Sequence, residues 1–218
     1  MAALALAVCV GARADPAPPP QEFSAPQQGL DVGRADEWIY ETRDSQTDAA
    51  LSTLDVVVVE KRSSEIAVRM RITDANTSLT RVSAATFDNF WRKAPDALSP
   101  GDGYQDSWGV RPKMRVGDEW NYGFERTLMG GPIRMAWIGH GEVLAAERLT
   151  LPSGRTFDTF EIEFFERPSV ARYHYQMHVL EWFAPEANRY VKRQVQSRLN
   201  GETADDTTET LLDFIKRR

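Results

Sequence analysis

Two of the three histidines stand four residues apart, at His174 and His178. On a helix this spacing places two imidazoles on one face, where they could share a metal ion. The residues around them alternate between apolar and polar side chains, which predicts a β-strand instead. Four residues of strand extend over ~13 Å, whereas zinc binds each imidazole nitrogen at ~2.0 Å. We therefore expect no metal site at this pair, and His140 is the only other histidine.

The residue types used in nucleophilic or carboxylate catalysis form no recognisable pattern. The chain has no G-x-S-x-G motif, and its single cysteine, Cys9, lies in an apolar N-terminal segment. Glu161 and Glu163 could act as paired carboxylates, but they alternate onto the side of a strand that should face solvent. A serine, a histidine and an aspartate could still converge through the fold. From the residues we predict no catalytic residue, no cofactor-binding residue and no cofactor.

The segment EWFAPEANRYVKRQ, residues 181–194, gathers charged and aromatic side chains as an active site would. However, Pro185 fixes its own φ, and PEAN is typical of a type I-like turn in which Asn188 suits the reversal of the chain. The segment therefore predicts a β-hairpin with Glu186 at its tip. We expect its strand charges, such as Glu181 and Arg193, to lie on a solvent-facing surface and to pair across the strands.

Alternation with a period of two residues dominates the chain and is clearest in residues 65–72, 160–166, 173–179 and 190–199. Strands that are apolar on one side are typical of an antiparallel sheet with one face on a core. We expect a mostly β fold with few short helices, built from meandering hairpins as a single curved antiparallel sheet or a part-open β-barrel. The best helix candidate is the segment 45–55, which could also be a turn.

Ten aromatic residues are candidates for facing a ligand or for filling the core. Trp38 with Tyr40, and Trp120 with Tyr122, are spaced so that each pair lies on one face of a strand. Large aromatic residues at the entry to a strand are more often part of the core than of a binding site. The full set is Trp38, Tyr40, Trp120, Tyr122, Trp137, Phe160, Phe164, Tyr173, Tyr175 and Trp182.

The N-terminal residues predict export. Residues 1–10 are apolar, and Ala-Arg-Ala at 12–14 is typical of a signal-peptidase site, so we place the cut between Ala14 and Asp15. The apolar stretch lacks a positively charged start, which leaves open a leader that begins before Met1. Lipidation of Cys9 would need a small residue where Val8 stands and is not expected. We expect a periplasmic or secreted protein of a Gram-negative-type bacterium.

The remaining residues predict one domain. The proline-rich residues 15–34 indicate a flexible tether, and residues 35–218 suit one antiparallel β domain with two loosely similar halves, 35–92 and 116–218. The halves share the echoes DEWIYE at residue 36 and DEWNYGFE at residue 118. A net charge of −6 argues against nucleic acid as a partner. No apolar run reaches the ~20 residues that span a bilayer.

A family resemblance rests on VGDEWNY at residues 116–122, LPSGRTFDTFEIE at 151–163, EWFAPEANRYVKRQ at 181–194 and ETLLDFIK at 209–216. Their order resembles a bacterial periplasmic and cell-envelope family known as a domain of unknown function, with motifs G-D-x-W-x-Y, P-x-G-T-F and Y-A-P-E-x-G-x-x-V-K-R. The chain departs from this pattern at Arg155, where the family has glycine, and at EANR in the last turn. The resemblance implies a curved sheet or part-open barrel similar to periplasmic carriers of lipoproteins and lipids, and it supplies no catalytic residues.

These observations favour an exported, non-catalytic protein that binds a hydrophobic or amphiphilic ligand or an envelope partner. A structural or interaction protein of the envelope is the first alternative. A carboxylate-dependent hydrolase of envelope material is the second, and it requires two buried acids with raised pKa values in one pocket. The oligomeric state is left open.

Overall fold

The computed structural model describes residues 18–27, 29–91, 111–127, 134–170 and 174–217, with only the backbone for residues 125–127, 134 and 135. Within these ranges the chain forms twelve strands and no helix. The strands are β1 Glu22–Ser24, β2 Glu37–Asp44, β3 Ala50–Lys61, β4 Glu65–Asp74, β5 Thr80–Asp88, β6 Lys113–Arg115, β7 Glu119–Thr127, β8 Arg134–Thr150, β9 Thr156–Pro168, β10 Tyr175–Ala184, β11 Arg189–Leu199 and β12 Glu202–Ile215.

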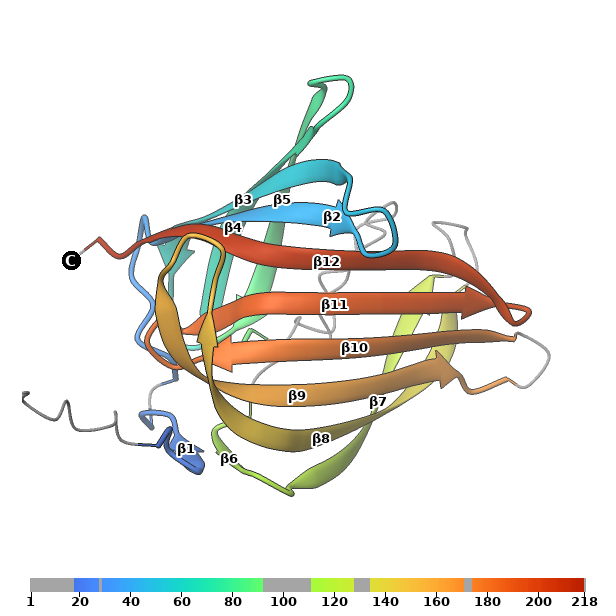
Figure 1. The fold of residues 1–218 in the computed structure, drawn as a ribbon. Coiled ribbons are helices and arrows are strands. Elements are labelled where there is room, and N and C mark those ends of the chain that lie inside the picture. Colours follow the sequence, from blue (N-terminus) through green and yellow to red (C-terminus); the bar gives the residue numbers. More distant parts are fainter. Residues whose placement is uncertain (1–17, 28, 92–110, 128–133, 171–173, 218) are drawn as a thin grey trace, which may run out of the picture.

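Ten of these strands form one antiparallel sheet in the order β5-β4-β3-β2-β12-β11-β10-β9-β8-β7. The first meander, β2 to β5, joins the second, β7 to β12, where β2 pairs with β12. Figure 1 shows the sheet curving around its interior without closing, since β5 and β7 are not paired with each other. The expected mostly β fold with one curved antiparallel sheet is therefore confirmed.

The helix expected at residues 45–55 is wrong, because a side chain caps a turn there and β3 begins at Ala50. The carboxylate of Asp44 accepts hydrogen bonds from the backbone N–H groups of Gln46 and Thr47 at 3.0 and 2.7 Å. The next hairpin, β4–β5, repeats this turn, with Asp74 accepting from Asn76 and Thr77. An aspartate that satisfies these N–H groups in a turn competes with a helix for the same backbone donors.

The two faces of the sheet differ in exposure, as the alternation predicts. The face that we call inner carries Trp38, Val56, Phe160 and Val179, each no more than 1% exposed. The outer face carries the intervening residues. In β12 Thr207, Glu209 and Leu211 take the buried positions, and a β-bulge between Leu211 and Asp213 leaves Leu212 45% exposed and brings Phe214 beside Trp38. The alternation of ETLLDFIK, residues 209–216, predicts that Thr210, Leu212 and Phe214 share one face, and this prediction is wrong.

A short two-stranded ribbon of β1 and β6 packs against the inner core. Phe23 of β1 lies 5.2 Å from Phe183 and 6.2 Å from Phe160, measured between ring centroids, and Met114 of β6 is 2% exposed. Leu30 and Val32 are also buried, at 1% and 3% exposure. Part of the segment expected to be a tether is therefore packed on the core, because its few apolar side chains bury surface there.

The part of the chain that the structure describes includes no helix with the length and apolarity needed to cross a bilayer.

Candidate functional site

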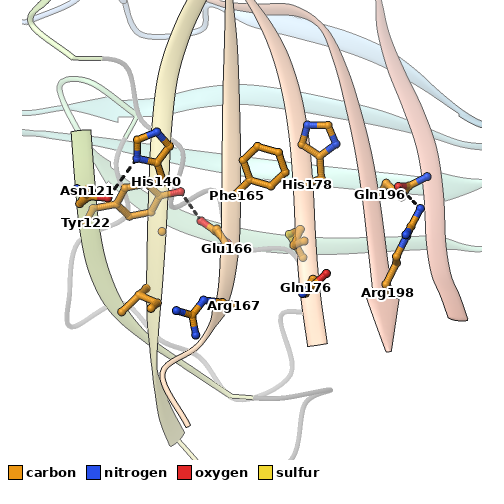
Figure 2. A pocket seen from close by; sticks show the side chains of 13 residues that line it. Asn121, Tyr122, His140, Phe165, Glu166, Arg167, Gln176, His178, Gln196 and Arg198 are labelled. Atoms are coloured by element: carbon orange, nitrogen blue, oxygen red, sulfur yellow. Dashed lines mark hydrogen bonds between the residues drawn. The ribbon is translucent and has the colours of Figure 1, made fainter. Parts of the chain in front are cut away.

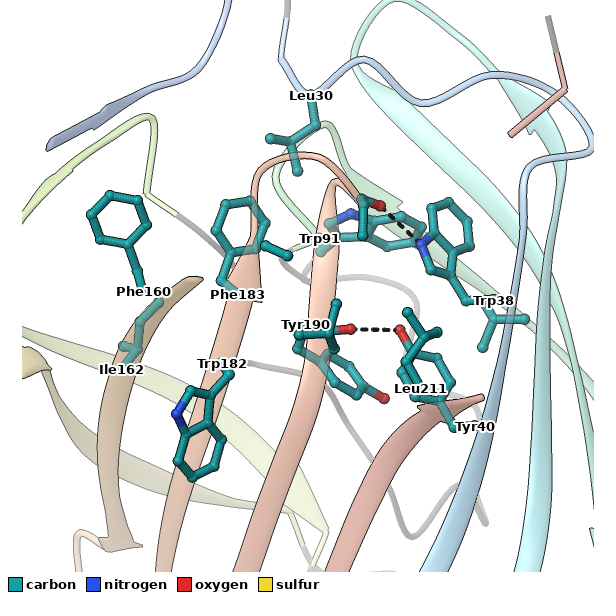
Figure 3. Close-up of a cluster of buried hydrophobic side chains, with 14 of the residues drawn as sticks. Leu30, Trp38, Tyr40, Trp91, Phe160, Ile162, Trp182, Phe183, Tyr190 and Leu211 are labelled. Carbon is teal, nitrogen blue, oxygen red and sulfur yellow. Dashed lines mark hydrogen bonds between the residues drawn. The ribbon is translucent and has the colours of Figure 1, made fainter. Parts of the chain in front are cut away.

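Trp38 and Tyr40 of β2 lie in the inner core, as Figure 3 shows. The Trp38 indole N–H donates to the carbonyl of Ala187 at 2.9 Å, and the Tyr40 hydroxyl donates to the carbonyl of Tyr190 at 2.9 Å. The two tyrosine rings stack with centroids 4.7 Å apart. Both side chains are fully buried, and backbone carbonyls of residues 184–190 accept hydrogen bonds from their polar atoms. These hydrogen bonds connect β2 to the β10–β11 turn.

Trp120 and Tyr122 of β7 lie across glycines of β8 on the inner side. A Cβ atom at Gly141 would stand 2.5 Å from the Trp120 ring, and one at Gly139 would stand 2.3 Å from the Tyr122 ring. The glycines therefore make room for the two rings, and the Tyr122 hydroxyl reaches over β8 to donate to Glu166 of β9 at 2.8 Å. Burial, and next the negative charge of Glu166, raise the pKa of Tyr122 far above its usual value.

The other aromatic candidates divide between the two faces. Trp137, Phe160 and Phe164 are each 1% exposed, and Tyr175 of β10 meets Trp137 edge to face at 5.4 Å. Trp182 lies on the outer side of β10, where its N–H donates to Glu147 at 2.5 Å and the Lys192 ammonium stands 4.3 Å from the ring. Tyr173 lies outside the described residues. The ten candidates therefore do not line one common cavity in the part of the chain that is described.

Three charges of the 181–194 hairpin are buried, which corrects the expectation that its strand charges lie on a solvent-facing surface. Glu181, Arg189 and Arg193 are 3%, 3% and 2% exposed. Arg193 donates to Glu209 of β12 at 2.7 and 3.1 Å, and the Tyr190 hydroxyl donates to the same carboxylate at 2.9 Å. The expected turn is present, with Asn188 at φ 53°, and Glu186 pairs with Arg155 at 2.9 Å. Arg193 alternates with Val191 and Val195 and so takes an inner position of β11. The rule that charged side chains face solvent fails at this residue.

Two of the acids considered for hydrolysis are buried on the inner face. Glu166 is 2% and Glu181 is 3% exposed, whereas Glu161 and Glu163 lie on the outer side of β9, and Asp158 is half-buried and paired with Arg148. Burial, followed by the charge of Glu147, raises the pKa of Glu161. The hydrolase alternative would be excluded if Glu161, Glu163, Glu166, Asp158 and Glu181 all faced solvent, and the burial of Glu166 and Glu181 means that they do not.

A groove with a volume of about 730 Å³ crosses strands β7 to β11, and Figure 2 shows the side chains that line it. Nine of its thirteen lining residues stand at outer positions of their strands, and we call this feature the outer groove. Phe165 and Ile138 are 48% and 40% exposed there, although both are large apolar side chains. The nine are Asn121, Ile138, His140, Phe165, Arg167, Gln176, His178, Gln196 and Arg198.

The centre of the outer groove is an aromatic and imidazole platform. The rings of Phe165 and His178 stack with centroids 4.5 Å apart and planes at 4°. His178 is held by a 2.7 Å contact between its Nε2 atom and Glu163, and His140 Nδ1 lies 3.1 Å from the Asn121 side-chain oxygen. These partners fix both imidazoles on the sheet, so the platform exists before any ligand arrives.

The sequence carried a signal for this groove that the alternation rule passes over. Phe164 and Phe165 are adjacent in β9, so one of the two rings must point away from the core. Arg167 of β9 and Arg198 of β11 are both exposed. They come to lie on either side of β10 only when the sheet forms. Sequence reasoning found His178 and Gln176 on the polar side of their strand but assigned them no role.

The histidines do not form a metal site within the described ranges. His174 precedes β10, His178 lies within it, and no group of three or more histidine, cysteine or acidic side chains in these ranges is placed to hold an ion. The side chains that line the outer groove can stack on a ligand, exchange hydrogen bonds with it and contact its charges.

Comparison with known proteins finds no matching protein-family model and no match among curated proteins. Several solved structures resemble the chain, and three of them follow. A Bacteroides fragilis protein described as exported, with a YmcC-like fold, has 12% identity and a TM-score of 0.48, over 86% of this chain and 99% of that one. A Parabacteroides distasonis lipoprotein has 14% identity and a TM-score of 0.48, over 85% and 97%. The Escherichia coli lipoprotein YmcC has 13% identity and a TM-score of 0.40, over 85% and 89%. Likeness at this level establishes neither a family nor a function for this chain.

Proposed function

We propose that this chain is an exported cell-envelope protein that binds an amphiphilic ligand in the outer groove and catalyses no reaction. The observation that carries the proposal is the exposure of Phe165 and Ile138 inside a groove of about 730 Å³. Known ligand sites are mostly apolar clefts of roughly 300–1,000 Å³ with a few polar groups that orient the ligand. The export part of the proposal rests on the apolar residues 1–10 and the Ala-Arg-Ala site.

The groove offers both kinds of surface that an amphiphile needs. Phe165 and Ile138 supply apolar contact, and the stacked ring of His178 widens that surface. The amides of Asn121, Gln176 and Gln196 stand around it and can exchange hydrogen bonds with a polar headgroup. On the inner face, by contrast, Trp38 and Phe183 are fully buried, Trp38 against Trp91 and Phe214, and Phe183 against Phe23 of β1.

The test replaces the most exposed apolar side chain of the groove. We expect Phe165→Ser to weaken binding of dodecyl maltoside, measured by isothermal titration calorimetry below its critical micelle concentration. Covering the half-exposed ring is worth about 1 kcal/mol, so the dissociation constant should rise about fivefold. Val82→Ser is the matched control, because Val82 is 63% exposed on β5, away from the groove. Equal affinities for Phe165→Ser and the wild type would refute the proposal.

A second candidate, an interaction protein of the envelope, is favoured by the edge strand β5. In the described sheet β5 pairs only with β4, and Val82 and Leu79 near its start are 63% and 70% exposed. An unpaired strand edge can accept a strand from another chain. Crosslinking through a cysteine placed at Val82 in an envelope extract tests this candidate, and the absence of a stoichiometric product would count against it.

A further inference from the structure

We propose that the outer groove selects amphiphiles with an anionic headgroup, phosphate or carboxylate, and that Arg167 and Arg198 bind that group. This inference rests on the proposed function and adds the charge of the ligand. The two arginines occupy one end of the groove, on strands β9 and β11.

The first argument is the position of the two guanidinium groups. Gln176 of β10 pairs with Arg198 of β11, and on its other side the register of β9 and β10 brings Arg167 alongside it. Neighbouring strands are 4.7–4.9 Å apart, so the two Cα atoms stand roughly 10 Å from each other. Two side chains as long as arginine can converge over Gln176 from that distance. Figure 2 shows Arg167, Gln176 and Arg198 along the same end of the groove.

The second argument concerns which carboxylates the guanidinium groups of Arg167 and Arg198 contact. Within the described ranges seven arginines contact a carboxylate, namely Arg43, Arg62, Arg71, Arg115, Arg148, Arg155 and Arg193. No carboxylate in those ranges pairs with Arg167 or Arg198. Arg198 makes only a long 3.4 Å hydrogen bond to the Gln196 side chain, and the nearby Asp206 accepts from Gln196 and Gln46 instead.

In a chain with 32 acidic and 26 basic residues, two guanidiniums on either side of β10 that pair with no carboxylate of the described ranges are a local excess of positive charge. The planar guanidinium matches a phosphate or carboxylate with two parallel N–H donors, and such charge-assisted bonds are stronger than neutral ones. The side-chain amide of Gln176 between them adds a further donor.

The third argument is that the opposite border of the groove repels anions. Glu119, Glu142 and Glu163 stand at adjacent cross-strand positions on β7, β8 and β9. Like charges placed directly opposite one another repel, and they also repel an anionic ligand. The headgroup can therefore lie only at the arginine end, and the ligand has one orientation.

The fourth argument ties the anion to an apolar chain. Ile138 pairs directly with Arg167 across β8 and β9, and Phe165 is two residues from Arg167 on the same face of β9. A free inorganic anion would leave both apolar side chains uncovered. An anionic amphiphile covers them while its headgroup contacts the arginines, so we commit to an amphiphile as the occupant.

The test compares two probes with the same dodecyl chain, monododecyl phosphate and dodecyl maltoside, by isothermal titration calorimetry below their critical micelle concentrations. We expect the wild type to bind the phosphate at least tenfold more tightly than the maltoside. The double variant Arg167→Gln/Arg198→Gln should lose this preference, so that its affinities for the two probes differ by less than twofold. The control Arg69→Gln/Arg81→Gln removes two exposed charges from β4 and β5 and should keep the preference.

A second measurement needs no variant. The phosphate preference of the wild type should fall severalfold between 20 and 300 mM NaCl, because salt screens contacts of exposed charges. A preference that survives in Arg167→Gln/Arg198→Gln, or its absence in the wild type, would overturn the inference and leave amphiphile binding standing. Binding of inorganic phosphate as tight as that of monododecyl phosphate would overturn the choice of occupant. If Phe165→Ser leaves maltoside binding unchanged, the proposed function itself fails.

Discussion

The contact between Arg193 and Glu209 gives a quantitative test of the inner core. Both side chains are nearly inaccessible, at 3% and 8% exposure, and their charged atoms are 2.7 Å apart. Removing one partner of a buried ion pair typically costs about 3–5 kcal/mol, because it leaves an uncompensated charge in a medium that solvates it poorly. Since a domain is stable by only about 5–15 kcal/mol, this loss is a large part of the total.

We therefore expect Arg193→Met to lower the free energy of unfolding by about 4 kcal/mol. With a urea m-value of about 2 kcal/mol/M, the unfolding midpoint falls by roughly 2 M. The double variant Arg193→Met/Glu209→Leu should recover at least half of the loss, because it removes both buried charges and leaves apolar side chains of similar volume. Recovery will stay incomplete, since the Tyr190 hydroxyl loses its acceptor.

Urea unfolding followed by circular dichroism measures the wild type, Arg193→Met, Glu209→Leu and the double variant at the same pH. Arg62→Met is the matched control, because the ion pair of Arg62 with Glu60 is 64% and 54% exposed and its loss should leave the midpoint unchanged. The reasoning is refuted if Arg193→Met shifts the midpoint no more than Arg62→Met does. It is also refuted if the double variant loses the sum of the two single losses, since partners in one buried contact cannot act independently.

Three further predictions concern turns, glycines and tyrosines. Gly139→Ala should lower the melting temperature far more than Gly123→Ala, because the new Cβ would stand 2.3 Å from the Tyr122 ring in the first case and 3.4 Å from a carbonyl oxygen in the second; equal melting temperatures would refute this. Hydrogen bonds from the Thr47 N–H and hydroxyl lower the pKa of Asp44 in the folded state. The carboxylate therefore stabilises the fold above its unfolded-state pKa, and this contribution disappears as the pH falls through its folded-state pKa. The melting temperatures of Asp44→Ala and the wild type should differ at pH 7 and converge at low pH. Burial raises the pKa values of Tyr40 and Tyr122 above the usual 10. At least two of the six tyrosines should therefore stay protonated at pH 11 until the protein unfolds, as measured by absorbance at 295 nm. Normal titration of all six tyrosines would contradict the structure.

Local rules predicted much of the fold because they depend on near neighbours in the chain. The alternation around Phe160 and Ile162 correctly placed these residues on a core face, and PEAN correctly placed the turn at Asn188. The helix expected at residues 45–55 was wrong because Asp44 caps its turn with a side chain, a choice that apolar spacing does not record. The face expected for Leu212 was wrong because Leu211 takes the inner position, and a bulge after it then returns Phe214 to the inner side.

The residues of the candidate site could not be predicted from local patterns, because the site depends on how strands pair. The outer groove brings together residues from five strands, and its platform depends on the register that sets Phe165 beside His178. Pairing between strands is fixed by hydrogen bonds across the sheet, which no single stretch of sequence encodes. The burial of Arg193 likewise depends on Glu209, sixteen residues away, which supplies the opposite charge in the interior.

By itself, the sequence determined that this chain alternates, turns and pairs as a curved antiparallel sheet, because side-chain direction along a strand reverses at every residue. Only the tertiary structure decided which polar residues the core takes in and which apolar ones it leaves outside. Arg193 can be buried because Glu209 meets it, and Phe165 is exposed because Phe164 already occupies the inner position. Such outcomes depend on what the neighbouring strand brings to the same row, and that is a property of the folded sheet.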